Sequence, residues 1–150
     1  MRKSRSRGGL VSIGYGGRRP SDLLQLLLQE GVHVLVDVRL SPRTRIPGFS
    51  GSALANALRA AGIEYRHEPQ LGNPVENQEP LRSGSSAARS TFQRLLESEG
   101  RGALHALTIE AASHRVAVLC AERDSNRCHR QVIVESVTGL NPAVAVTTLA

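Results

Sequence analysis

The predicted fold rests on one nearly continuous apolar run, Arg115-Val116-Ala117-Val118-Leu119-Cys120-Ala121. Apolar residues at both odd and even positions indicate a strand that is buried on both faces. Such strands are typical of a parallel sheet that helices cover on both sides. This run therefore predicts a central strand of an α/β domain, with further strands and helices before and after it in the sequence.

Shorter apolar or β-branched runs predict four more strands, at residues 10–13, 32–38, 63–67 and 143–149. Segments rich in leucine and alanine predict helices at residues 20–30, 52–61, 87–99, 103–113 and 128–137. Prolines and glycines predict a long loop at residues 69–85. Strands that alternate with helices need crossover connections, so we expect a three-layer α/β/α fold with a mainly parallel sheet of about five strands.

The chain has 150 residues and a formal net charge of +6. A chain of this length is most simply one domain, which we place at residues 10–150. Four of the positive charges belong to Arg2, Lys3, Arg5 and Arg7. Residues 1–9 therefore predict a disordered basic tail with a weak attraction for nucleic acid or another polyanion.

The composition excludes several classes of protein. Its hydrophobic content of 40% and charged content of 21% are ordinary for a globular protein and exclude wholesale disorder. No apolar run approaches the roughly 20 residues of a membrane span, so no membrane partner is expected. Because no secretory signal is visible, the two cysteines, Cys120 and Cys128, predict a cytoplasmic protein with free thiols.

The candidate site follows from the expected topology, because ligands of open parallel sheets bind outside the carboxyl ends of the strands. That rule selects residues 14–19, 37–48, 67–73 and 120–130. The last segment leaves the central strand and enters a helix that Asp124, Ser125 or Asn126 could cap. The free backbone N–H groups at the start of a helix favour an anion there.

The leading hypothesis is an Arg-rich anion (phosphate) pocket at this edge of the sheet, with a nucleotide or nucleic acid as the suspected ligand. Its expected binding residues are Tyr15, which could stack on a base, and Arg39, Arg43, Arg45 and Arg130. If the protein is an enzyme, its expected catalytic residues are Asp37, Glu122, Cys128 and His129. Arg130 is expected to be free for the anion, so its removal is expected to change stability little.

Two other functions fit the same segments. In a Cys-dependent thiol, redox or sulfur-transfer enzyme, Cys128 would be the nucleophile or redox centre, Cys120 the resolving partner and His129 a base. A non-catalytic module would instead bind polyanions through the basic tail and the arginine-rich loop. Both alternatives stay open, and the sequence indicates neither the substrate nor the oligomeric state.

No cofactor is assigned from the sequence. Cys120, Cys128, His129 and His67 are potential metal ligands, but their spacing matches no standard zinc module, so no metal site is predicted.

A dinucleotide site is also considered. Gly14-Tyr15-Gly16 follows the first strand, and Asp37 lies near the position of a ribose-binding acid. The third glycine position of that pattern is Arg19, however, so the close packing of helix and strand would be lost. This departure argues against NAD.

Several motifs together resemble one family. They are Ile13-Gly14-Tyr15-Gly16-Gly17, Val36-Asp37-Val38-Arg39, residues 41–49, Gly62-Ile63-Glu64-Tyr65-Arg66-His67, and Cys120-Ala121-Glu122-Arg123-Asp124 followed by Cys128-His129-Arg130. Residues 12–137 are similar to the domain-of-unknown-function 488 family. The resemblance implies a single small α/β domain and assigns no activity.

The pattern positions of that family fall on identifiable residues of this chain. They are Tyr15, Asp37, Arg39, Pro42, Arg43, Arg45, Gly48, Phe49, Tyr65, Leu71, Gly72, Cys120, Glu122, Cys128, His129 and Arg130. One position departs from the pattern: Asn73 stands where the family has a glycine. We therefore expect the segment that covers the site to be altered there.

Overall fold

The computed structural model describes residues 8–150. The predicted tail at residues 1–9 lies outside the described residues, except for Gly8 and Gly9. Gly9 already pairs with Arg115 of the central strand, so the first strand begins one residue before the predicted strand at residues 10–13.

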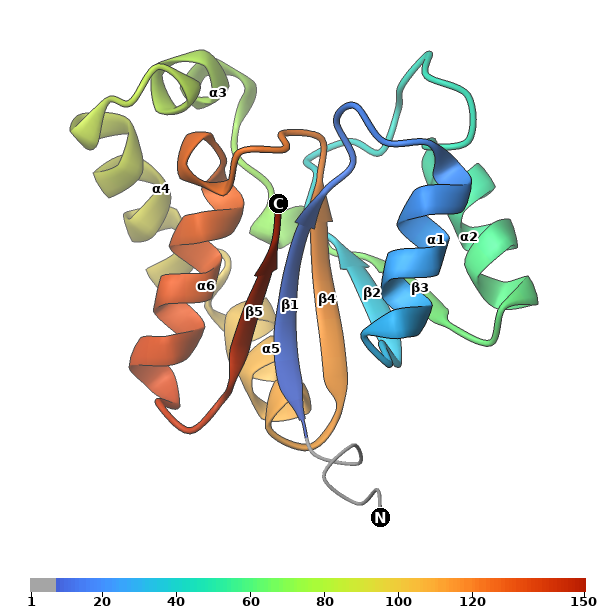
Figure 1. Cartoon of the computed structure of the whole chain (residues 1–150). Helices are drawn as coiled ribbons and strands as arrows, with labels where there is room; N and C mark the ends of the chain where they lie inside the picture. The colour runs from blue at the N-terminus through green and yellow to red at the C-terminus, as the bar shows by residue number, and fades with distance from the viewer. Residues whose placement is uncertain (1–7) are drawn as a thin grey trace.

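The described residues form a five-stranded sheet in which every neighbouring pair of strands is parallel, with the order β3-β2-β4-β1-β5 (Figure 1). Its strands are β1 (Gly9–Gly14), β2 (Val34–Asp37), β3 (Glu64–His67), β4 (Arg115–Cys120) and β5 (Val146–Leu149). The apolar run from which the prediction started is β4, at the centre of the sheet. The predicted parallel α/β fold is therefore confirmed.

Six α-helices connect these strands within residues 8–150: α1 (Pro20–Gln29), α2 (Gly51–Ala60), α3 (Val75–Arg82), α4 (Ser86–Glu97), α5 (Arg101–Ser113) and α6 (His129–Leu140). None of the described helices is long and apolar enough to cross a lipid bilayer.

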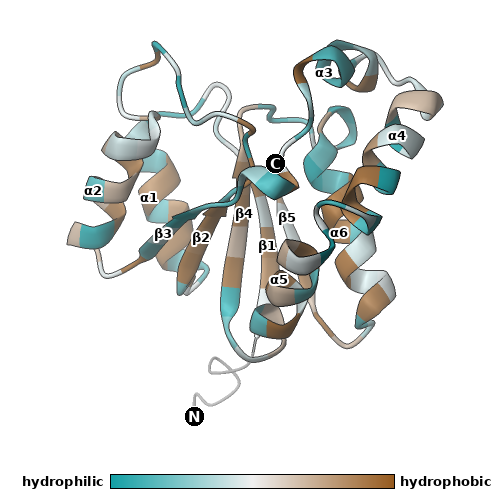
Figure 2. Cartoon of the chain, turned by 180° about the vertical axis from the view of Figure 1, so that it is seen from behind, coloured by the Kyte–Doolittle hydropathy of each residue, from teal (hydrophilic) through white to brown (hydrophobic). Residues whose placement is uncertain are grey.

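The strand β4 explains why the sheet is covered on both faces. Val116 and Val118 pack with the buried residues of α4, α5 and α6, whereas Ala117 and Leu119 pack with those of α1 and α2. Successive side chains of a strand point to opposite faces of the sheet, so both the odd-numbered and the even-numbered residues of β4 must be apolar. Figure 2 shows the result as mostly apolar colouring along β2 and β4 between the two helical layers. The three-layer α/β/α prediction is confirmed.

The predicted long loop at residues 69–85 is wrong. A short 3-10 helix, Pro69–Leu71, and the helix α3 occupy most of it. Pro74 and Pro80 suggest a loop, but Pro74 directly precedes α3, where a missing N–H costs little. Pro80 lies inside α3, which continues beyond it to Arg82. The last helix, α6, continues through Gly139 to Leu140, slightly beyond its predicted end at residue 137.

Two buried asparagines hold α3 in place. Asn77 donates from its amide to Asn73 Oδ1 at 2.9 Å and to the carbonyl of Ala88 at 3.0 Å. Asn73 donates in turn to the carbonyl of Asn77 at 3.2 Å. A glycine at position 73 could form neither of the two bonds that use the side chain of Asn73. The departure from the family pattern at Asn73 therefore coincides with a side chain that anchors the segment over the sheet edge.

Candidate functional site

The site lies where the connections after β2 and β4 separate. These two strands are neighbours, but β2 leads to α2 on one face of the sheet and β4 leads to α6 on the other. Diverging connections of this kind open a crevice at the carboxyl ends of the strands. A cavity of about 340 Å³ occupies it, lined by Tyr15, Arg39, Leu40, Ser41, Arg43, Asn73, Val75, Gln78, Leu81, Arg82, Cys120, Ala121, Glu122, Arg127, Cys128 and His129.

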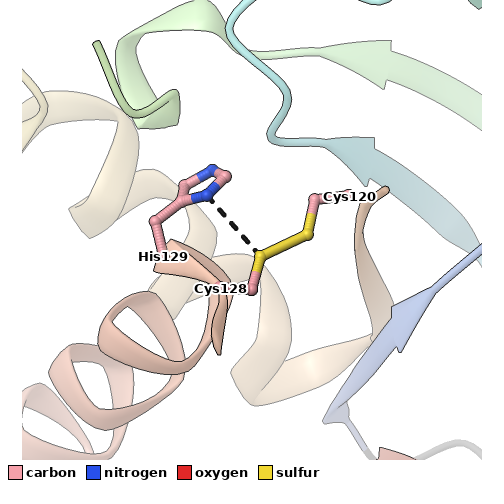
Figure 3. A group of neighbouring side chains, drawn as sticks. All are labelled: Cys120, Cys128 and His129. Atoms are coloured by element: carbon pink, nitrogen blue, oxygen red, sulfur yellow. Dashed lines mark hydrogen bonds between the residues drawn. A yellow bond between two sulfur atoms is a disulfide. The ribbon is translucent and has the colours of Figure 1, made fainter. Parts of the chain in front are cut away.

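Two sulfur atoms meet at the inner wall of this cavity. Cys120 is the last residue of β4, and Cys128 is the N-cap of α6, where its Sγ accepts from the backbone N–H of Arg130 at 3.4 Å. The two residues form a disulfide bond, drawn in Figure 3. The expectation of free thiols is therefore wrong for this structure. The loop between them folds back over the end of β4, a closure that the spacing in the sequence does not reveal.

The residue that caps α6 also differs from the prediction. Asp124 does not cap α6, as the sequence suggested it could. Its carboxylate accepts from the backbone N–H of Asn126 at 3.0 Å and caps the short 3-10 helix Ser125–Arg127. The sulfur of Cys128 caps α6 instead. The backbone of the helix therefore holds the side chain of this expected catalytic residue in place.

Arg130 is fully buried and serves the protein interior. Its guanidinium donates to Ser12 Oγ at 2.7 Å, to the carbonyl of Glu122 at 2.7 Å and to Cys120 Sγ at 3.0 Å, with Cys128 Sγ at 3.8 Å from the same Nη1. Within the described residues it forms no ion pair with a carboxylate. Burial lowers the pKa of Arg130 to about 10. This side chain does not point free into the cavity, so it does not have the position expected of an anion ligand.

His129 lies between the sulfur pair and the backbone of β2. Its Nε2 is 2.7 Å from the carbonyl of Val38, which can only accept, so Nε2 carries the ring proton. The lone pair of Nδ1 therefore faces Cys128 Sγ, 3.6 Å away (Figure 3). Burial, and to a smaller degree the charge of Arg130, lower the pKa of His129 to about 4. The imidazole is therefore neutral near pH 7.

Asp37 and Arg39 form an ion pair beneath the cavity. The carboxylate of Asp37 is fully buried and accepts from Arg39 Nη2 at 2.6 Å, from Arg39 Nε at 2.8 Å and from the Tyr65 hydroxyl at 2.7 Å. Burial lowers the pKa of Arg39, but the bonds to Asp37 outweigh that effect and raise it. Burial and the same carboxylate raise the pKa of Tyr65. Both charges are thus used within the protein.

The ring of Tyr15 is already stacked. It lies against Phe49 with the ring centroids 4.4 Å apart, and the guanidinium of Arg39 lies 5.3 Å from its centroid. Arg39 also donates to the carbonyl of Phe49 at 2.8 Å. Tyr15 lines the cavity, but Phe49 occupies a face of its ring that a base could have used.

The other charged residues of the predicted site are Arg43, Arg45 and Glu122. Arg43 is exposed, lines the cavity and forms no ion pair with a described residue, whereas Arg45 is exposed outside it. Glu122 is the only carboxylate in the lining, and its Oε2 lies 3.4 Å from Nε of Arg82. The structure therefore brings Arg43 and Glu122 to one opening and leaves Arg45 apart.

The metal-ligand candidates divide into two groups. Cys120, Cys128 and His129 are all buried, and their ligand atoms lie within 4.8 Å of one another. His67 is not part of this group, and its Nε2 lies 2.9 Å from the carbonyl of Arg39. The set of four considered from the sequence is thus reduced to three.

One residue of the site was missed in the sequence, and a second, Gly14, was considered there only for a dinucleotide site. Ser12 is a fully buried hydroxyl in the middle of β1 and accepts from Arg130. A lone polar residue within an apolar strand was a usable signal, because buried hydroxyls need a partner. Gly14 ends the same strand, and a Cβ there would overlap the backbone carbonyl of Glu122. The approach of two loops, rather than a dinucleotide, accounts for this glycine.

A comparison with family models places the chain. The model described as Domain of unknown function DUF488 matches residues 19–137, which include α1, most of α6 and the whole of the segment between Cys120 and Arg130. No curated protein matches the sequence. Since the matched region covers most of the chain, this protein belongs to the DUF488 family.

Proposed function

We propose that this protein is a Cys-dependent thiol–disulfide exchange enzyme that acts on small anionic disulfides. One observation carries the proposal: the buried guanidinium of Arg130 contacts both sulfurs and has no carboxylate partner among the described residues. A buried charge without a counter-charge is costly. In the reduced protein, a thiolate at Cys120 or Cys128 supplies the missing negative charge.

Cys128 is the attacking residue and Cys120 the resolving residue. Cys128 Sγ lies at the amino end of the twelve-residue helix α6, accepts from the N–H of Arg130 and faces His129 Nδ1. A helix amino terminus and nearby cations lower the pKa of a thiol. The two sulfur atoms are in contact in the structure, so Cys120 is placed to attack Cys128 in the resolving step.

The reaction balances in two exchange steps. The Cys128 thiolate attacks one sulfur of the substrate disulfide, forms a mixed disulfide and releases the other half of the substrate as a thiolate. The Cys120 thiolate then attacks Cys128 Sγ, closes the Cys120–Cys128 disulfide and releases the second half. Two electrons pass to the substrate, and the two thiol protons pass to the product thiolates. A thiol reductant returns the protein to the dithiol for the next turnover.

The cavity supports a small anionic substrate. A space of about 340 Å³ suits a small molecule, and Arg43 is the cation at its mouth that no described acid neutralises. Of the phosphate-binding pocket expected from the sequence, this proposal keeps only the selection of a negatively charged substrate by Arg43. Arg39 and Arg130 donate to protein groups and are not available to a ligand.

The exchange reaction is tested with the anionic aromatic disulfide dithiobis(nitrobenzoate). The reduced protein is expected to release both halves of the probe and to recover the Cys120–Cys128 disulfide. Cys120→Ser is expected to release one half only and to keep the other as an adduct on Cys128, because no resolving thiol remains. Mass spectrometry of the intact and digested protein locates the adduct.

Two results would contradict this assignment. One is stable adducts on both cysteines of the wild-type protein without an internal disulfide. The other is an adduct that forms as fast in Cys128→Ser as in Cys120→Ser, which would make Cys120 the attacking residue.

Charge selection at the mouth is tested by a pair of arginine variants. Arg43→Met is expected to slow the reaction with dithiobis(nitrobenzoate) several-fold and to leave the rate with neutral dipyridyl disulfide nearly unchanged, because only the first probe carries carboxylates. Arg45→Met is the matched control, since Arg45 is exposed on the same loop but does not line the cavity. A role for Arg43 would be refuted if the wild type, Arg43→Met and Arg45→Met reacted at the same rate with each probe. It would also be refuted if both variants slowed the reaction with dithiobis(nitrobenzoate) equally.

A further inference from the structure

The geometry points to a second state of the same residues: we propose that the reduced protein binds one Zn²⁺ ion through Cys120 Sγ, Cys128 Sγ and His129 Nδ1. These three atoms lie within 4.8 Å of one another at the inner wall of the cavity, and all three residues are buried. The two thiols lose their protons on binding, and no electron transfer is involved.

His129 is already arranged as a ligand. Its Nε2–H donates to the carbonyl of Val38 at 2.7 Å, which leaves the Nδ1 lone pair directed at Cys128 Sγ. A metal-binding histidine characteristically fixes its other ring N–H on a carbonyl or carboxylate in this way. Zn–S and Zn–N bonds of about 2.3 and 2.0–2.1 Å in tetrahedral geometry place the two ligand atoms about 3.5–3.6 Å apart. The observed distance from Cys128 Sγ to His129 Nδ1 is 3.6 Å.

The backbone spacing of the cysteines leaves room for an ion. Their Cα atoms are 7.8 Å apart. Disulfides usually join Cα atoms roughly 4.4–6.8 Å apart. Two sulfurs on one tetrahedral zinc are about 3.8 Å apart. Once the disulfide is reduced, rotation of the side chains can therefore separate the sulfurs by that amount without moving β4 or α6.

The ligand types select a soft ion. Two thiolates and one imidazole suit Zn²⁺ and exclude Mg²⁺ and Ca²⁺ as good occupants, because those ions prefer oxygen ligands. Two thiolates balance the charge of the ion, so the charge of Arg130 favours an anion as the fourth ligand. Arg130 remains hydrogen-bonded to the sulfurs, from Nη1 to Cys120 at 3.0 Å and from the backbone N–H to Cys128 at 3.4 Å. Hydrogen bonds to the ligand atoms are the usual outer support of a metal site.

Three protein ligands leave a fourth coordination position. Because Cys120, Cys128 and His129 all line the cavity, that position faces the space of about 340 Å³. Zinc sites with three protein ligands and one open position are those that bind water or substrate. The ion and the disulfide exclude each other, so bound zinc keeps the two thiols from oxidation.

This inference does not depend on the exchange reaction. A reduced protein that exchanges disulfides but binds no metal would overturn the zinc site alone. A protein that binds the metal but gives no exchange would overturn the proposed function alone.

The test uses Co²⁺ as a coloured substitute for Zn²⁺ on the full chain, reduced and kept free of oxygen. We expect the charge-transfer band of cobalt–thiolate bonds and the visible bands of tetrahedral cobalt, saturating at one ion per chain and disappearing when Zn²⁺ is added. His129→Gln keeps a donor for the carbonyl of Val38 but has no imidazole. Since loss of an outer partner already costs roughly 10–100-fold in affinity, loss of this ligand is expected to cost more than about 100-fold.

His67→Gln is the matched control, because His67 lies at the same sheet edge and its Nε2 also meets a backbone carbonyl, that of Arg39. Its affinity for Co²⁺ and Zn²⁺ is expected to equal that of the wild type. Cys120→Ser and Cys128→Ser are each expected to remove half of the thiolate band or abolish binding. The zinc site is refuted if the reduced wild type shows no tetrahedral cobalt spectrum or if His129→Gln binds as tightly as His67→Gln. It is also refuted if the cobalt–thiolate band keeps its full intensity in Cys120→Ser or in Cys128→Ser.

Discussion

Asp37→Asn is expected to lower the free energy of unfolding by about 3–5 kcal/mol, because it leaves the guanidinium of Arg39 buried without a counter-charge. Asp37 is fully buried and accepts from Arg39 and Tyr65 at 2.6–2.8 Å. The amide of asparagine would also point a donor at groups that themselves donate. Denaturation by urea, followed by circular dichroism, measures the loss.

Two comparisons make this result specific. Glu64→Gln removes one of the two carboxylates that pair with Arg66 at the neighbouring strand β3, the more exposed one, and it is expected to cost less than about 1 kcal/mol. Asp37→Leu combined with Arg39→Met removes both buried charges and is expected to be more stable than Asp37→Asn. If Asp37→Asn unfolds at the same urea concentration as Glu64→Gln, the buried pair does not hold this edge of the sheet together.

Arg130→Met is expected to reduce both the stability of the fold and the reactivity of the thiols. The hydroxyl of Ser12 and the carbonyl of Glu122 would lose their donor at a fully buried position, at a cost of about 2–4 kcal/mol in total. In the reduced, metal-free protein, the rate of reaction with dithiobis(nitrobenzoate) at pH 7 is expected to fall roughly tenfold or more, because a neighbouring positive charge favours the thiolate. Chemical denaturation and stopped-flow absorbance measure the two effects.

Arg127→Met is the control for Arg130→Met. Arg127 lines the same cavity but is exposed, and its Nε lies 3.6 Å from Asp124 rather than on a sulfur. We expect this variant to match the wild type in stability and to change the rate only slightly. Should Arg130→Met not fold, Arg130→Gln removes the charge and keeps a hydrogen-bond donor. Thiols that react at the wild-type rate in either Arg130 variant would contradict the role given to Arg130.

The fold was largely readable from the sequence because the sheet is covered on both faces. The inner strands β2 and β4 are largely apolar runs, and the helix α1 is bounded by a proline and a glycine, Pro20 and Gly31. The helix α3 was missed because Pro74, Pro80 and Gly84 are also typical of loops. Asn73 and Asn77 support it through side-chain hydrogen bonds to each other and from Asn77 to the carbonyl of Ala88, which composition alone does not indicate.

The candidate site was only partly predictable. The rule for carboxyl ends of strands found the correct edge and both cysteines. It could not say which arginines are free, because that depends on acceptors supplied by distant segments. Ser12 is 118 positions from Arg130 in the chain, and their hydrogen bond decides that the guanidinium faces inward. Charge in a sequence indicates how many cations are present, whereas only packing indicates which of them remain available to a ligand.

The strand order has a consequence for how the chain acquires its structure. The two neighbours of β1 are β4 and β5, and β2 meets β1 only through β4. Residue 9 therefore has no strand to pair with until residue 115 has been made, and the apolar strands β1 and β2 must wait for β4 to insert between them. Pairings so distant in sequence close large loops and slow the search for the native state. During synthesis, the amino-terminal half of this protein emerges from the ribosome well before its sheet can assemble.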